Sequence, residues 1–252
     1  MNALAQGAAV GATGMVSLTA GGIWSAIHHP SNRTRAIVRH LAAGTVFAGL
    51  VSDVLERLLK SAHYWWMGFG MVLGLSLMTF IRAREERTKG GAALAPFIVV
   101  DVLIDGVLMG LSVASGSPFT VLFVIALMPE LGLLGMTLSD ELGGSEWGAL
   151  KRIIAPGFVG IGVVAGGILG AWSRSGPDAL AITIEGFGAI ALAYLVTEAL
   201  LREAHGQAEQ PWIAAMFFAG FIPLFLAAAA TAGSKTIFNF IGRCATTSIS
   251  CI

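Results

Sequence analysis

Long apolar segments separated by short polar breaks make up most of this sequence, and they restrict the chain to few architectures. A helix needs about 20 mostly apolar residues to cross a bilayer. Eight segments meet this length, at residues 4–27, 36–59, 64–83, 93–114, 117–138, 151–172, 179–201 and 211–232. Within lipid only helices and closed barrels satisfy their backbone hydrogen bonds, and strands of this length would be anomalous. The pattern therefore predicts an all-α integral membrane protein, with one transmembrane domain of eight helices over residues 1–252.

The composition agrees with this prediction and excludes some partners. Hydrophobic residues make up 56% of the chain and charged residues only 12%, whereas soluble domains carry roughly 25% charged residues. The formal net charge is zero, so no basic surface for nucleic acid is expected. The two cysteines, Cys244 and Cys251, stand near the end of the chain. A disulfide framework or cysteine metal cluster is therefore excluded for the body of the protein.

The distribution of Lys and Arg between alternate loops predicts the orientation in the membrane. One side carries Arg33, Arg35, Arg39, Arg82, Arg84, Arg87, Lys89, Lys151, Arg152 and Arg202. The other side carries Arg57, Lys60, Arg174, Lys235 and Arg243. Because the more basic side faces the cytoplasm, we expect both termini outside, in the periplasm of a bacterial-type inner membrane.

Six carboxylic acids stand inside the predicted spans, where ionisable residues cost about 2.5–3.5 kcal/mol on insertion scales and are usually functional. They are Asp53, Asp101, Asp105, Glu130, Glu185 and Glu198. The predicted spans contain no deep lysine or arginine, so these carboxylates lack obvious cationic partners. We expect them to be protonated, to reach water or to coordinate a cation.

Three of the six are predicted to converge. Asp101 and Asp105 are four residues apart in 99-VVDVLIDGVLMGLSVASG-116, so they share one helix face. Their mutual repulsion would be reversed by a divalent cation. Glu130 follows Pro129 in the next segment, where the proline is expected to kink the helix. The short SGSP connection makes the two segments antiparallel, and a rise of about 1.5 Å per residue places all three carboxylates near mid-membrane.

Other interpretations of these acids stay open at this point. Buried carboxyls can be protonated and form hydrogen bonds between helices without binding any ion. Glu185 and Glu198 lie on nearly opposite helix faces, so they cannot serve one site, and Glu185 is either buried or solvated at the outer end of its span. Asp53 with Ser52 forms either a polar pair on a transport pathway or a hydrogen bond in helix packing.

Several of these segments resemble motifs of the ZIP (Zrt/Irt-like) divalent-metal transporters. DVLIDG in the fourth segment resembles H-N-x-P-[DE]-G, and ALMPEL in the fifth is similar to Q-[ND]-x-P-E-G of the GufA-like branch. GAIALAYLVTEALLREAHGQ in the seventh resembles G-A-x-x-Y-V-x-x-E-L-I-P-E-A-H. The second segment, AAGTVFAGLVSDVLERL, and the eighth, MFFAGFIPLFL, carry weaker likenesses. The resemblance covers most of the chain, with the same order of motifs.

The resemblance implies a ZIP-like bundle with a metal site between the fourth and fifth helices. Asp101 stands at the family's histidine ligand, Asp105 at its acidic ligand and Glu130 at its fifth-span glutamate ligand. Glu198 and His205 match the acidic and histidine positions near the end of the seventh span. Together with Asp53, these two are expected to line the transport pathway.

The departures from the family pattern imply one metal site instead of two. Val102, Ala126 and Leu127 replace the family's polar residues, and the sixth segment carries no glutamate. With aspartate in place of histidine, the ligands would be oxygen atoms only. Oxygen ligands favour Mn²⁺, Fe²⁺ or Mg²⁺ relative to Zn²⁺, although tetrahedral Zn²⁺ with carboxylates also remains open.

The sequence therefore predicts a transporter of divalent metal cations of the Zn²⁺, Fe²⁺ or Mn²⁺ class, working by alternating access. We expect no enzymatic activity and no cofactor besides the transported metal, and a homodimer is one assembly that the sequence allows. One alternative is a ZIP-fold protein that binds metal or protons without transporting them. An intramembrane aspartyl enzyme is disfavoured, because Asp101 and Asp105 share one helix and a division into acid and base is awkward there.

Overall fold

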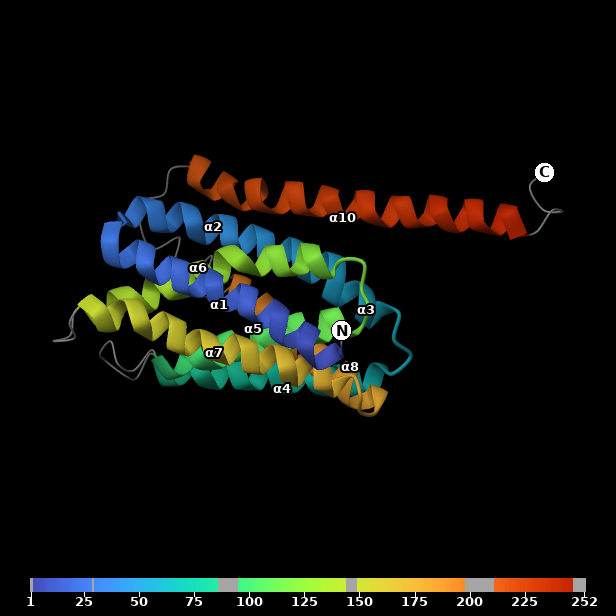
Figure 1. The fold of residues 1–252 in the computed structure, drawn as a ribbon, viewed down its shortest axis with the longest axis horizontal. Helices are drawn as coiled ribbons and strands as arrows, with labels where there is room; N and C mark the ends of the chain where they lie inside the picture. The colour runs from blue at the N-terminus through green and yellow to red at the C-terminus, as the bar shows by residue number, and fades with distance from the viewer. Residues whose placement is uncertain (1, 29, 86–94, 144–148, 198–210, 247–252) are drawn as a thin grey trace.

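The protein is a bundle of long helices over the part of the chain that the structure describes (Figure 1). The computed structural model describes residues 2–28, 30–85, 95–143, 149–197 and 211–246. The helices in order are α1 (Ala3–His28), α2 (Asn32–Gly49), η1 (Leu50–Leu55), α3 (Glu56–Leu59), α4 (Tyr64–Glu85), α5 (Ala95–Ala114), α6 (Thr120–Gly143), α7 (Ala149–Ser173), α8 (Asp178–Tyr194) and α10 (Pro211–Thr246). The all-α prediction is confirmed for these residues.

Seven described helical stretches are long and apolar enough to cross a membrane. They are Ala3–His28, Asn32–Leu59, Tyr64–Arg84, Thr120–Leu142, Arg152–Ser173, Asp178–Thr197 and Trp212–Ala232. The predicted fourth span corresponds to α5, whose 20 residues extend for about 30 Å. Large apolar side chains such as Trp65, Val121 and Phe158 are exposed on the surface of the bundle. Soluble monomers rarely expose extended apolar patches, so the fold is compatible with a multi-pass membrane protein.

The polar breaks in the sequence supply the signals that end one helix and start the next. Ser31 caps α2, with its side chain accepting a hydrogen bond from the backbone N–H of Thr34 at 3.2 Å, which satisfies a donor that the helix leaves unpaired. Gly116 has a φ of 65° in the turn after α5, a left-handed conformation that favours glycine. Pro177 precedes α8, and Asp178 stands in its first turn, where a carboxylate complements the helix dipole.

Glycine allows α1 to approach α6 at backbone distance. The buried side of α1 is formed mostly by glycines spaced three or four residues apart. A Cβ placed on Gly21 would lie 1.9 Å from the carbonyl oxygen of Gly132, and one on Gly135 would lie 1.9 Å from that of Leu18. Because no side chain fits at these positions, the small residues determine which helices pair within the bundle.

The helices form a close-packed group of α1, α5, α6 and α7, and two flanking pairs. In the flanking pairs α4 packs on α8 and α10 packs on α2, while α2 also contacts α6. The bundle has two ends. Its N-terminal end contains the start of α1, η1 with α3, the α5–α6 turn and the start of α8. Its opposite end contains the end of α1, the start of α2, the end of α6 and the start of α7.

Some predicted boundaries differ from the structure. The second span, predicted at residues 36–59, is a continuous helical rod from Asn32 to Leu59 in the structure. Within this rod, Leu50–Leu55 is a π-helix. The last helix continues to Thr246, well beyond the predicted end at residue 232. The seventh span is α-helical from Asp178 to Tyr194 and changes to π-helix at residues 195–197. The pathway residues expected in the last part of this span and just after it, Glu198 and His205, lie outside the described residues.

Candidate functional site

Two carboxyl groups are buried on the neighbouring helices α5 and α6, within electrostatic range of each other. Asp105 on α5 has an exposed fraction of 0% and Glu130 on α6 has one of 1%. Glu130 lies within electrostatic range of Asp105 and, more weakly, of Asp101. None of the four carboxyl oxygens of Asp105 and Glu130 has a hydrogen-bond partner. An unpaired carboxylate in a low-dielectric interior is costly, so this pair calls for a bound cation or a proton.

Close helix packing holds the pair in place. A Cβ on Gly106, next to Asp105, would lie 2.3 Å from the carbonyl oxygen of Val163 on α7, so α7 supports α5 at backbone distance. On the other helix, Ser17 of α1 donates a hydrogen bond to the carbonyl of Met128 at 2.6 Å. The α6 helix continues through Pro129. Val102, Ala126 and Leu127, which are three or four residues from Asp105 or Glu130 along the chain, are apolar and fully buried.

The third predicted ligand, Asp101, is less deeply placed. Its side chain is partly exposed, and it takes part in interactions of its own. Among the described residues, no group of three or more His, Cys, Asp and Glu side chains is arranged to hold a metal ion. The three-carboxylate site therefore stays a prediction, of which Asp105 and Glu130 are the clearly adjacent part. Two carboxylates together with water are a usual ligand set for hard cations such as Mg²⁺.

A second polar cluster lies at the N-terminal end of the bundle and centres on Asp53. This residue belongs to the π-helix η1 and is fully buried. Ser112, near the end of α5, donates a hydrogen bond to Asp53 Oδ2 at 2.7 Å, and Ser117 in the following turn donates to Oδ1. Single-turn π segments within α-helices occur frequently at functional sites. Here the segment contains the carboxylate that joins α2 to the α5–α6 turn.

Arg57 supplies a cationic partner that these carboxylates were predicted to lack. Its Nη1 pairs with Asp53 one turn before it, and its Nε donates to Glu185 Oε1 on α8 at 3.1 Å. The prediction that the carboxylates lack cationic partners is therefore wrong for Asp53 and Glu185. An arginine near the end of a span can fold back along its own helix, and the side chain of Arg57 is only 15% exposed.

Two further expectations about this cluster are settled by the same contacts. Ser52 donates to the carbonyl of Ala48 at 2.7 Å, so its hydroxyl is not the partner of Asp53. Glu185 is 5% exposed, so the solvated alternative is wrong. The signals that could have found this cluster are the i,i+4 spacing of Asp53 and Arg57, together with Ser112 before the SGSP turn and Ser117 within it.

A third polar cluster joins the helices at the opposite end. Arg35 of α2 forms an ion pair with Asp140 of α6 at 2.5 Å, and Ser25 of α1 donates to the same carboxylate at 2.5 Å. Arg152 of α7 donates to the carbonyl of Ser139 at 3.1 Å. Polar contacts therefore connect the helices at both ends of the bundle, with the Asp105–Glu130 pair buried between them.

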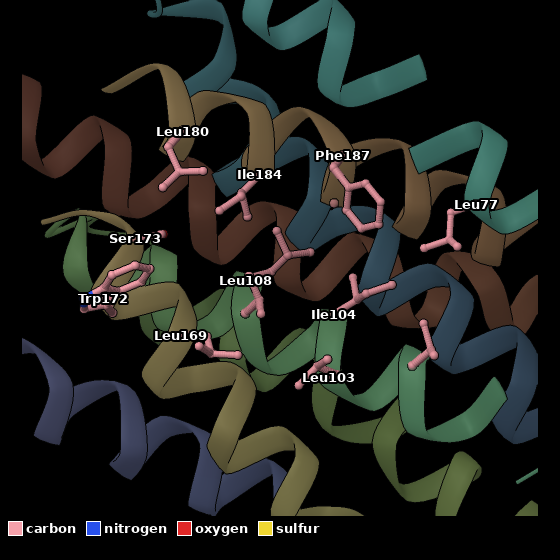
Figure 2. A pocket seen from close by; sticks show the side chains of 13 residues that line it. Leu77, Leu103, Ile104, Leu108, Leu169, Trp172, Ser173, Leu180, Ile184 and Phe187 are labelled. Atoms are coloured by element: carbon pink, nitrogen blue, oxygen red, sulfur yellow. The ribbon is translucent and has the colours of Figure 1, made fainter. Parts of the chain in front are cut away.

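The bundle also contains an apolar cavity of about 410 Å³ between α4, α5, α7 and α8 (Figure 2). Figure 2 shows Leu103, Ile104 and Leu108 on one side of this cavity and Leu180, Ile184 and Phe187 on another. Its single polar side chain, Ser173, donates its hydroxyl hydrogen to the carbonyl of Gly170. The cavity therefore offers no ligand set for a cation, and it lies on a different face of α5 from Asp105.

The comparisons with known proteins add no assignment to this geometry. No protein-family model matches the chain, and no curated protein matches it. The function is therefore inferred from the arrangement of the residues described above.

Proposed function

We propose that this protein transports divalent metal cations across a membrane by alternating access, with Asp105 and Glu130 holding the ion in transit. The observation that carries the proposal is the pair of adjacent, fully buried carboxyls whose four oxygens have no hydrogen-bond partner. Neither acid forms a hydrogen bond to another helix, and we propose that a bound cation compensates both.

The surroundings of the pair also support transport. Both acids are closed off from solvent, and polar clusters that can break and re-form connect the helices at each end. Such an arrangement suits an occluded state between two access states. Asp101, one turn from Asp105, is placed to join the ligand set when the helices shift, as the resemblance to ZIP transporters implies.

Oxygen-only ligands determine the cations that we expect. Carboxylate and water ligands suit Mn²⁺ and Mg²⁺, while imidazole and thiolate ligands shift the preference toward Zn²⁺. We therefore propose Mn²⁺ as the best-fitting cargo, with Fe²⁺ next and Zn²⁺ accepted less well. The proposed setting is a bacterial-type inner membrane with both termini in the periplasm.

The test is uptake of Mn²⁺, Fe²⁺, Mg²⁺ and Zn²⁺ into proteoliposomes that contain the wild type, Asp105→Asn or Glu130→Gln. Asp178→Asn is a matched control, because the side chain of Asp178 is 76% exposed in the first turn of α8. We expect uptake by the wild type and the control and loss of uptake in both site variants. Equal uptake in all four proteins would reject the site.

The same samples distinguish transport from binding alone. The absence of a three-ligand group among the described residues favours, as a second candidate, a ZIP-like protein that binds a cation without moving it. Purified protein that binds Mn²⁺ through Asp105 and Glu130 but shows no uptake in proteoliposomes would support that second function.

A further inference from the structure

The polar cluster centred on Asp53 lies nearer the N-terminal end of the bundle than the buried carboxyl pair, on the same face of α5. Ser112 is seven residues after Asp105 on α5, and Phe123 is seven residues before Glu130 on α6. Seven residues are two helical turns, or about 10.5 Å, and return to nearly the same helix face. The serine that binds Asp53 therefore shares a face of α5 with Asp105. A path from the N-terminal end to the carboxyl pair along this face passes Asp53 first.

Between the two polar levels lies a thin apolar layer. Phe123 and Ala126 of α6 are fully buried, and both lie against Gly49 of α2. A Cβ on Gly49 would be 2.8 Å from Ala126 Cβ and 3.1 Å from a ring carbon of Phe123. At this layer α2 and α6 are in close contact, and Leu108 and Met109 of α5 are also fully buried there. The path would therefore open only if the two helices separated at this level.

Arg57 lies at the N-terminal end of this path, between the two carboxylates that would attract an arriving cation. Its guanidinium lies between the carboxylates of Asp53 and Glu185 and compensates one of their two negative charges. The third guanidinium nitrogen, Nη2, has no hydrogen-bond partner. The arginine is thus held by one contact to each acid, without the bidentate geometry that makes such pairs strongest.

The same cluster provides a polar connection between the two helix groups at this end. Asp53 and Arg57 belong to the rod formed by α2, η1 and α3, whereas Ser112 and Ser117 belong to α5 and the α5–α6 turn. On the α4–α8 side of α5 the apolar cavity replaces close packing over part of the interface (Figure 2). Breaking the Asp53 contacts would therefore remove the polar connection between the rod and the α5–α6 turn, and the packing of α2 on α6 would remain to be opened.

We propose that Arg57 is a tethered cation that closes the N-terminal mouth of the path to Asp105 and Glu130. Release of its guanidinium from Asp53 and Glu185 opens the path and leaves two carboxylates that attract the incoming ion. The arginine thus acts by holding Asp53 and Glu185 together in the closed state, and it does not bind the transported ion. The cargo in this inference rests on the proposed function, whereas the closure itself is a property of the bundle and can be tested without metal.

The experiment measures access to the buried layer through a cysteine at Ala126, in a chain with Cys244→Ser and Cys251→Ser. A membrane-impermeant, cationic thiol reagent is added to the N-terminal side of right-side-out proteoliposomes with a chelator present. Closed proteins commonly populate an open state at about 0.1–10%, so we expect Arg57→Met to raise the modification rate about tenfold or more. Arg57→Lys, which restores the charge without the fork of the guanidinium, should fall between the wild type and Arg57→Met.

Lys60→Met is the matched control. This substitution also removes one positive charge, but from an exposed ion pair with Glu56 that lies one turn further along the chain. It should leave the modification rate unchanged. Equal rates in the wild type and Arg57→Met would overturn the closure, as would an equal rise in Lys60→Met. Should Arg57→Met fail to fold, Asp53→Asn weakens the same anchor and carries the same expectation. Metal uptake by the wild type is measured in parallel, and its absence would reject the proposed function without altering the labelling result.

Discussion

Two buried glutamates with opposite surroundings give the sharpest stability prediction. Glu130 and Glu185 are 1% and 5% exposed, but Glu130 has no hydrogen-bond partner and Glu185 accepts one from Arg57 at 3.1 Å. A buried polar group without a partner costs about 1–3 kcal/mol. Replacing Glu130 by methionine, which has a similar length, removes that cost. We therefore expect Glu130→Met to raise the free energy of unfolding by about 1–3 kcal/mol in metal-free solution.

The same substitution at the other glutamate should act in the opposite direction. Glu185→Met leaves the Nε donor of the buried guanidinium without its acceptor, so we expect a loss of about 1–3 kcal/mol. Both variants are compared with the wild type by thermal unfolding in detergent with a chelator present. A Mn²⁺ concentration one hundred times Kd should then stabilise the wild type by about 2.7 kcal/mol and leave Glu130→Met unchanged. Destabilisation of Glu130→Met to the same extent as Glu185→Met would refute the reasoning, because Glu130 would then have a partner that stabilises it.

Three other substitutions test the helix packing and the opposite end of the bundle. Gly21→Ala places a Cβ 1.9 Å from the carbonyl oxygen of Gly132, so α1 and α6 must separate, and we expect a loss of about 1–3 kcal/mol in thermal unfolding. Gly68→Ala, where nothing lies within 4 Å of the new Cβ, should instead be neutral or stabilise by up to about 1 kcal/mol. Arg35→Gln removes the ion-pair partner of Asp140 and leaves the Ser25 hydrogen bond in place. We expect a loss of about 1 kcal/mol, and an unchanged midpoint would show that this ion pair contributes nothing.

The helices and the buried acids were within reach of the sequence. Apolar length alone predicts spans, because a bilayer core imposes a minimum number of residues. The proximity of Asp105 and Glu130 also follows from local information, since a short turn joins their helices and both stand at a similar distance from it. Asp101 is four residues from Asp105, but its own contacts depend on neighbouring helices that this spacing does not specify.

The pairing of Arg57 with Glu185 could not be predicted from the sequence, whereas its pairing with Asp53 has a local i,i+4 signal. Arg57 and Glu185 are 128 residues apart, and their contact depends on how η1 and α8 are placed across the bundle. The π-helix at Leu50–Leu55 carries no apolar periodicity that distinguishes it from the α-helix around it. The glycine contacts of α1 show the same limit, because glycines indicate close packing without naming the helix that approaches them.

The most direct test of the central claim is the number of Mn²⁺ ions bound per purified chain, measured by electron paramagnetic resonance during titration. We predict one ion per wild-type chain, loss of that ion in both Asp105→Asn and Glu130→Gln, and its retention in Asp178→Asn. Each site variant replaces one carboxylate oxygen of this buried pair, whose oxygens have no hydrogen-bond partner, and removes the charge of that group. Equal binding by all four proteins, or no binding by the wild type at Mn²⁺ concentrations that saturate uptake, would contradict the account.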